Sequence, residues 1–250
     1  MTAHTTGLIA ELSAELCARK KQYEWYRDQF LSFLMNNEAD ISQVPWLHSL
    51  LTKYAPNGVE WKRLGEIASY MDGAAHEHFM HPEVDKYVVC KVRFISSDGN
   101  YKMYSDRRPS PVNAGDVIMV MSDVPNGKSL AKCYYIDIDD LYTINQRVCC
   151  LSANIEVIRS KYLYYVLNRN PQLLMHDNGL TQTHLKKKWI LDVKIPLIPL
   201  GMQDVLVEFW DKMLQMSNDL SSCITSEIEA RKKQYEYYRD KLLSFNVREC

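Results

Sequence analysis

The stretch ARKKQYEYYRDKLLSF, from Ala230 to Phe245, occurs twice in this chain. The other copy, ARKKQYEWYRDQFLSF, runs from Ala18 to Phe33, 212 residues earlier, and the two differ only at Trp25/Tyr237, Gln29/Lys241 and Phe30/Leu242. Such a repeat has to be identified before local structure is assigned, because it determines the architecture. The arrangement predicts two copies of one helical spacer on either side of a dissimilar functional domain.

Apolar and aromatic residues recur at steps of three and four through both copies. They predict a helix from about Gly7 to about Met35 and a second from Met202 to Phe245, which would be about 65 Å long at 1.5 Å per residue. This heptad-like spacing favours helix-on-helix packing, and its many tyrosines favour a slender antiparallel, coiled-coil-like bundle. The residues expected to face a partner helix or a second copy of the chain are Tyr23, Tyr26, Phe30, Leu206, Phe209, Met213, Tyr235, Tyr238 and Leu242.

Between the two helices, runs of β-branched and aromatic residues are separated by turn-forming residues. They predict a β-rich domain with a few helices. The expected strands are Val88–Ile95, Val117–Met121, Ala131–Ile138 and Trp189–Ile195, with helices at Val44–Tyr54 and Tyr162–Arg169. The sequence therefore predicts an α+β fold with a spacer helix at 1–36, a linker and short helix at 37–58, a β-rich domain at 59–200 and a second spacer helix at 201–250.

The composition is that of an ordinary globular protein, with 46% hydrophobic and 24% charged residues among 250. No apolar run approaches 18 residues, so no membrane span is expected, and no basic start precedes the first apolar residues as in a secretory signal. Seven cysteines without a C-x-x-C pair predict free thiols in a reducing cytoplasm. The formal charge of −1 does not itself indicate a polyanion-binding protein, although a local basic face would be sufficient for one.

Motifs for catalysis are incomplete in this sequence. An adenine methyltransferase needs Asn/Asp-Pro-Pro followed by an aromatic residue, but Asn170-Pro171-Gln172 lacks the second proline and the aromatic residue. Gly127-Lys128-Ser129 resembles the end of a phosphate-binding loop, yet Ser122 stands where that loop requires a glycine. We therefore expect a non-catalytic chain.

A histidine cluster offers a possible metal site. Three imidazoles, His76, His78 and His81, lie within six residues and could bind zinc. No cysteine partner is nearby, so we favour a solvated loop near DNA and expect no metal.

Six segments, in this order, resemble one known family. They are APNGVEWKRLGEI (Ala55–Ile67), NAGDVIMVMSD (Asn113–Asp123), INQRVCCL (Ile144–Leu151), KYLYYVL (Lys161–Leu167), GLTQTHLKKKWILDVKIPLIPL (Gly179–Leu200) and EIEARKKQYEYYRDKLLSF (Glu227–Phe245). Together they resemble the specificity subunit of Type I restriction-modification systems over essentially the whole chain. The terminal helix is the most distinctive of these motifs.

The resemblance implies DNA recognition without catalysis. The usual member of the family has two target-recognition domains, each of which binds one half of a split site in double-stranded DNA, and two conserved helices that set their spacing. Methyltransferase subunits dock around these helices, and restriction (motor-nuclease) subunits join them for cleavage. S-adenosylmethionine, ATP and Mg would then belong to the partner subunits, and we expect no cofactor in this chain.

The sequence departs from the family pattern by having one recognition domain instead of two. A counterpart of Met202–Lys212 would precede Met1, so Leu206–Met216 would have no full-length mate in the same chain. We therefore expect a homodimer that imitates the two-domain subunit and recognises an inverted repeat. Pairing with another half-subunit, or a truncated or recombining cassette, is the alternative.

Basic and amide side chains of the 59–200 domain are the candidates for DNA contacts. Lysine and arginine neutralise phosphates, whereas Asn, Gln and Arg can contact base edges. We expect Gln182, Asn100 and Arg107 to contact bases and Lys186–Lys188 to contact phosphates. The full expected set is Lys91, Arg93, Asn100, Lys102, Arg107, Arg108, Thr181, Gln182, Lys186, Lys187 and Lys188. A solvated loop is the alternative for each of them, and a coiled-coil interaction protein with a β-rich ligand domain and no DNA role is the alternative for the chain.

Overall fold

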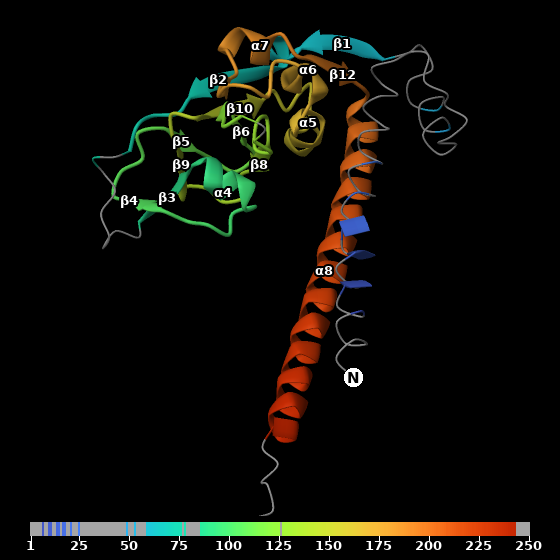
Figure 1. Ribbon diagram of the computed structural model, residues 1–250. Helices are drawn as coiled ribbons and strands as arrows, with labels where there is room; N and C mark the ends of the chain where they lie inside the picture. The colour runs from blue at the N-terminus through green and yellow to red at the C-terminus, as the bar shows by residue number, and fades with distance from the viewer. Residues whose placement is uncertain are drawn as a thin grey trace, which may run out of the picture. The chain divides into compact units, whose positions relative to one another are not determined.

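The computed structural model describes residues 59–76, 78, 86–125 and 127–243, together with single residues between positions 7 and 53. The chain divides into two compact units, Phe33–Val207 and a second unit made of Met1–Ser32 with Glu208–Cys250. Helix α8 (Leu200–Leu243) is continuous and contributes to both units (Figure 1). The predicted helices at Gly7–Met35 and Val44–Tyr54 fall largely outside the described residues, and the single residues described within them are helical.

Two four-stranded sheets form the framework of the Phe33–Val207 unit (Figure 1). One is antiparallel with the order β2-β10-β6-β8, and the other has the order β4-β3-β9-β5 with β3 and β9 parallel. Two antiparallel pairs, β1 with β12 and β7 with β11, complete the strands. The bounds are β1 (Glu60–Arg63), β2 (Ala68–Asp72), β3 (Tyr87–Cys90), β4 (Tyr104–Ser105), β5 (Pro111–Val112), β6 (Val117–Val120), β7 (Ser122–Asp123), β8 (Cys133–Tyr135), β9 (Tyr142–Ile144), β10 (Val148–Ala153), β11 (Thr183–His184) and β12 (Lys194–Leu197).

One apolar core is shared by the two four-stranded sheets and a short helix. Ile118 and Val120 of β6 pack in it with residues of β3, β9 and β10 and with Phe94. The alternate β6 residues Val117 and Met119 are also fully buried, and α5 packs against β6, β8 and β10. A strand buried on both faces is expected to be apolar throughout, which accounts for the run at 117–121.

Short helices connect the strands of this unit. They are α3 (Leu64–Ile67), α4 (Val92–Ser96), α5 (Ser160–Leu167), α6 (Pro171–Leu174) and α7 (Lys187–Leu191). The predicted strand at Val117–Met121 and the predicted helix at Tyr162–Arg169 are confirmed as β6 and α5, and the predicted strand at Ala131–Ile138 is present only as β8.

The prediction of one strand from Val88 to Ile95 is wrong after Cys90. The chain turns at Lys91 and forms α4, which ends where Asp98 and Gly99 have positive φ of 52° and 83°. The Gly99 amide donates to the Phe94 carbonyl at 2.9 Å, a hydrogen bond typical of a glycine-terminated helix. The SSDGN turn is therefore a helix stop rather than a link between strands.

The predicted strand at Trp189–Ile195 is also wrong in its first half. Residues 187–191 form α7, and the strand begins only at Lys194. Ile190 and Val193 are buried and lie three residues apart, as on one face of a helix. Val193 and Ile195 are buried and lie two residues apart, as on one face of a strand. Short apolar runs satisfy both periods, so periodicity alone does not separate them.

Candidate nucleic-acid interface

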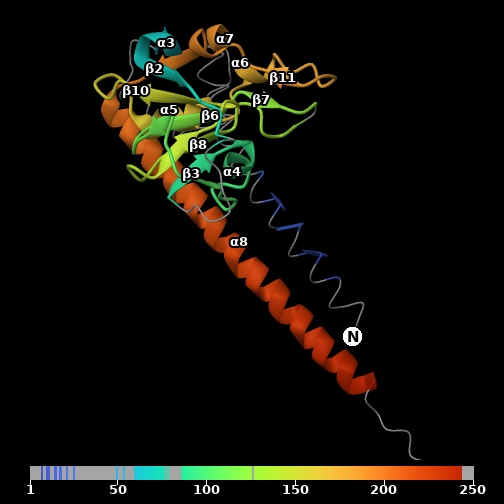
Figure 2. The same ribbon diagram turned by 90° about the vertical axis from the view of Figure 1, so that its left-hand side faces the viewer.

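The expected DNA-binding residues form two groups in the Phe33–Val207 unit. The first, which we call the α4 group, surrounds α4 and the loop from β4 to β5: Lys91, Arg93, Asn100, Lys102, Arg107 and Arg108. The second, the ribbon group, lies in the loop before β11 and at the start of α7: Thr181, Gln182, Lys186, Lys187 and Lys188. Figure 2 shows the ribbon of β7 and β11 projecting from the body of the unit.

Arg108 is held inside its own domain. Its guanidinium donates to Asp140 at 2.7 Å, to the Val112 carbonyl at 3.2 Å and to the Tyr142 carbonyl at 3.3 Å. Only 13% of the side chain is exposed. These three acceptors join β5 and β9 to the loop that contains Asp140, so Arg108 has a structural role.

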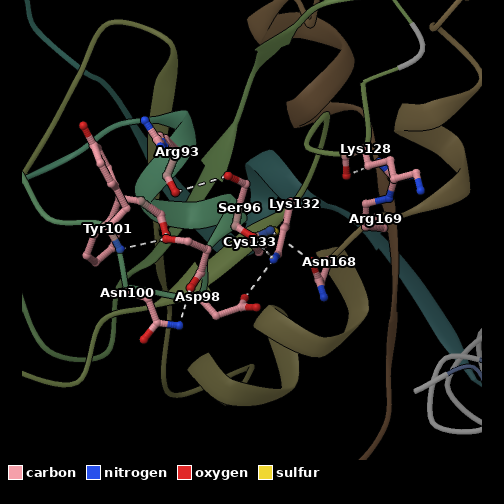
Figure 3. A network of polar contacts seen from close by, with 12 residues as sticks. Arg93, Ser96, Asp98, Asn100, Tyr101, Lys128, Lys132, Cys133, Asn168 and Arg169 are labelled. Atoms are coloured by element: carbon pink, nitrogen blue, oxygen red, sulfur yellow. Dashed lines mark hydrogen bonds and ion pairs between the residues drawn. The ribbon is translucent and has the colours of Figure 1, made fainter. Parts of the chain in front are cut away.

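Two further members of the α4 group take part in the local network drawn in Figure 3. The Arg93 guanidinium stacks 4.0 Å from the Tyr101 ring centre, and the Asn100 amide donates to the Ser97 carbonyl at 2.8 Å. Asp98 pairs with Lys132 at 2.8 Å, which ties the turn to the segment leading into β8. Lys102 and Arg107 are exposed, and Lys91 is half-buried.

In the ribbon group, the loop before β11 is fixed by two side chains. Asn178 Oδ1 accepts the amides of Leu180 and Thr181 at 3.0 and 3.1 Å. Asp177 Oδ1 accepts the Gly179 amide and the Thr183 hydroxyl, both at 3.0 Å. Short Asn and Asp side chains form such turns because they can satisfy backbone amides a few residues ahead. The loop that contains Thr181 and Gln182 is therefore ordered without a ligand.

Gln182 is oriented by a buried neighbour. Its Nε2 donates to the hydroxyl of Ser122, a buried residue of β7, at 2.9 Å. Among the described contacts this leaves one amide hydrogen and the carbonyl oxygen of Gln182 for another partner. That pair is the donor and acceptor with which glutamine binds the major-groove edge of adenine.

The three lysines begin helix α7 and are exposed. The Lys186 ammonium lies 5.0 Å from the Trp189 ring centre, and that of Lys187 lies 4.6 Å from the ring centre of Tyr70. Burial, together with a hydrogen bond to Asp72, raises the pKa of Tyr70, so its phenol is neutral. Lys186 and Lys187 thus rest on aromatic faces, and the exposed charges of all three lysines are available to phosphates.

Gly127-Lys128-Ser129, which resembles the end of a phosphate-binding loop in sequence, forms a turn around the side chain of Asp123. Asp123 Oδ2 accepts the Ser129 amide at 2.7 Å, and Asp123 Oδ1 accepts the Val124 amide at 2.9 Å. A Cβ at position 127 would lie 2.1 Å from the Asp123 carboxylate, so Gly127 is needed for this turn. A carboxylate, rather than a phosphate, occupies the turn.

The expectation of a solvated loop is wrong for His76, which is completely buried. Its Nδ1 lies 2.8 Å from the Ala74 carbonyl oxygen and its Nε2 lies 2.9 Å from the Thr143 hydroxyl. Within the described ranges, no three His, Cys, Asp or Glu side chains converge as metal ligands, and no helix there is long and apolar enough to cross a membrane.

A basic cavity at β1 and β12 was not expected from the sequence. It has a volume of about 620 Å³ and is lined by Trp61, Lys62, Arg63, Glu66, Gln172 and Lys194. The Arg63 guanidinium donates to Glu66 at 2.9 Å, and this hydrogen bond lowers the pKa of Glu66. Gln172 pairs with both the amide and the carbonyl of Lys194, so its side chain occupies the free edge of β12.

The expected partner-helix residues on α8 differ in exposure. Leu206 is buried within the Phe33–Val207 unit. In the second unit, Phe209 and Met213 are half-buried, whereas Tyr235 and Tyr238 are exposed. Leu242 is helical, and Tyr23, Tyr26 and Phe30 lie outside the described residues.

Residues 56–230 match the family described as Type I restriction modification DNA specificity domain, so the chain belongs to that family. It is 29% identical to the EcoR124I/EcoR124II specificity subunit of Escherichia coli over 96% of this chain and 56% of that protein. It is 24% identical to the putative type I specificity subunit S.MpnORF365P of Mycoplasma pneumoniae over 95% of this chain and 80% of that protein. The resemblance found in the sequence is thus confirmed.

Solved structures show the same fold. The S subunit of a Type I restriction-modification system from M. genitalium has a TM-score of 0.59 at 15% identity, over 92% of this chain and 56% of that one. A chain from a study of complex assembly and conformational transition of the type I R-M system also has a TM-score of 0.59, at 17% identity over 96% of this chain and 57% of that one. The chain therefore spans little more than half the length of several relatives that it matches.

Proposed function

We propose that this chain is a non-catalytic DNA-recognition subunit of a Type I restriction-modification complex and that its 59–200 domain binds one half-site. The match of residues 56–230 to the DNA specificity domain family carries the proposal. A coiled-coil protein without a DNA role would not account for that match.

DNA binding divides between two kinds of contact. Lys186, Lys187 and Lys188 neutralise phosphates and orient the domain, while Gln182 contacts a base edge through the amide that Ser122 orients. Lys102 and Arg107 are exposed candidates for additional contacts. Arg93, Asn100 and Arg108 have partners within the domain, so they act mainly by supporting it.

The conserved helices at 1–36 and 201–250 pair antiparallel, set the spacing of half-sites and dock methyltransferase subunits. Restriction subunits join this assembly in the cytoplasm and cleave DNA. The methyltransferase and restriction subunits bind S-adenosylmethionine, ATP and Mg, and they carry out methylation and cleavage. The near identity of the two helical repeats supports a common docking function.

Two copies of the chain form the complete recognition unit. A two-fold assembly presents the same domain twice and therefore recognises an inverted repeat. Sequencing the methylome of cells that carry only this specificity chain and its methyltransferase tests the arrangement. An asymmetric methylated sequence would contradict the homodimer and leave DNA recognition intact.

The phosphate contacts are tested by replacing Lys186, Lys187 and Lys188 together with alanine. Affinity for every duplex should fall, and the slope of log affinity against log salt should decrease by about 2.7, since each phosphate contact contributes about 0.9. The matched control replaces three exposed lysines of α8, Lys212, Lys232 and Lys233, and removes the same charge elsewhere. Equal salt slopes for the wild type and the α7 variant would contradict the assignment.

A further inference from the structure

The β7–β11 ribbon ends in two exposed apolar side chains. Thr183 pairs with Asp123 and His184 with Ser122, and Gln182 and Val124 are the residues directly beyond the last pair at this end of the ribbon. Val124 is 62% exposed, and Leu180, two residues before Gln182, is 83% exposed. The end of the ribbon therefore presents apolar groups beside the amide of Gln182.

We propose that this ribbon enters the major groove of duplex DNA and that Leu180 contacts the methyl group of a thymine there. The inference rests on the proposed function and assigns the recognition element and one base contact. The major groove is about 12 Å wide, which admits a two-stranded β-ribbon. The C5-methyl of thymine is the apolar group on the floor of that groove, and it suits a leucine side chain.

The ribbon is ordered on both strands before any DNA is bound. On the β11 side, Asn178 and Asp177 cap the loop, and Gly179 has a φ of +65° that lets the chain reverse just before Leu180. On the β7 side, Asp123 caps the turn. A preordered loop loses less conformational entropy on binding, which favours its use in recognition.

The base of the ribbon is attached to the body of the domain. The Leu185 amide donates to the Met121 carbonyl at 2.8 Å, which continues the pairing into the fold. His176 and Trp189 stack with ring centres 4.0 Å apart and planes 6° from parallel, so the segment after α6 is fixed to α7. The tip therefore keeps its position relative to the α7 lysines.

The charge of the ribbon favours nucleic acid, rather than an apolar protein surface, as its binding partner. The segments 122–130 and 176–188 contain four lysines and two carboxylates. Both carboxylates, Asp123 and Asp177, accept hydrogen bonds within the ribbon. An apolar tip beside uncompensated lysines matches a groove floor flanked by phosphates.

The experiment uses the full chain with its methyltransferase subunit and the target selected from random duplex DNA. Each thymine of the half-site is replaced in turn by deoxyuridine, which lacks the methyl group. At one position the wild-type complex should lose about fourfold in affinity, as expected for one methyl group left unburied. Leu180→Ala should bind the thymine duplex about fourfold more weakly and be insensitive to deoxyuridine at that position.

Ile155→Ala is the matched control, because Ile155 is 66% exposed and lies outside the ribbon. It should keep the wild-type response to deoxyuridine, and thermal melting should show both variants folded. Equal responses of the wild type and Leu180→Ala at every position, or a half-site without thymine, would overturn the inference while leaving DNA binding established. A wild-type complex that selects no duplex would overturn the proposed function and the inference with it.

Discussion

Arg108 and Lys187 are cations of the same domain with opposite surroundings. The Arg108 side chain is 13% exposed and donates to a carboxylate and two backbone carbonyls. Lys187 is exposed on α7, with its ammonium over an aromatic ring. Charge alone does not identify a DNA contact; the hydrogen-bond partners of the charged group have to be considered as well.

The same contrast holds for the two groups as a whole. In the α4 group, Arg93 stacks on Tyr101 and Asn100 closes its own turn, so these side chains maintain the loop that carries them. In the ribbon group, Asn178 and Asp177 maintain the loop. Leu180 and Gln182, which do not hold that loop, are the residues that we propose for recognition. If so, the ribbon separates supporting residues from contacting residues, and the α4 group largely does not.

The largest expected effect comes from replacing Arg108 with methionine. The substitution leaves two part-buried carbonyls without their donor, whereas Asp140, with 87% of its side chain exposed, is solvated by water. We therefore expect a loss of about 2 kcal/mol in the free energy of unfolding. Urea unfolding measures it. Lys102→Met, at an exposed position of the same group, is the control and should change stability by less than about 0.5 kcal/mol. Equal losses in the two variants would remove the distinction between supporting and contacting cations.

A smaller effect is expected for Gly179→Ala in the ribbon loop. A φ of +65° costs a residue with a Cβ about 1 kcal/mol, so the loop becomes strained or changes shape. We expect reduced discrimination between target and non-target duplexes, with non-specific affinity retained through the lysines. Gly201→Ala is the control, because no atom lies within 4 Å of a Cβ built at this position in the first turn of α8. Unchanged discrimination in Gly179→Ala would show that recognition does not depend on the loop geometry.

The sequence predicted features that depend on long-range pattern. The repeat at 18–33 and 230–245 indicated a long C-terminal helix, and α8 extends from Leu200 to Leu243 as expected. The apolar run at Val117–Met121 predicted a strand, and burial on both faces of β6 explains why that pattern was clear.

Features that depend on tertiary contacts were not predicted. The turn from β3 into α4 follows from packing of Phe94 and Ile95 in the core, which no local pattern in VVCKVRFI specifies. Two of the three partners of Arg108 could not be predicted from local sequence either, since Asp140 is 32 residues away and Tyr142 is 34 residues away. The burial of His76 was missed for the same reason, because its partner Thr143 is 67 residues away. Glycine at position 99, which ends α4, was the one local signal that could have corrected the strand.

The smallest effect is expected for Asn100→Ala, which separates support from recognition within the α4 group. Loss of the exposed hydrogen bond to the Ser97 carbonyl should reduce stability by about 0.5 kcal/mol. Affinity for the selected duplex should change less than about twofold, because the side chain holds its own turn. Gln182→Ala is the comparison, and it should lose about tenfold at one base pair, as expected for a lost bidentate base contact. Binding titrations against duplexes changed one base pair at a time measure both variants. A tenfold loss confined to one base pair in Asn100→Ala would place the α4 turn against the bases as well, and recognition would then involve both groups.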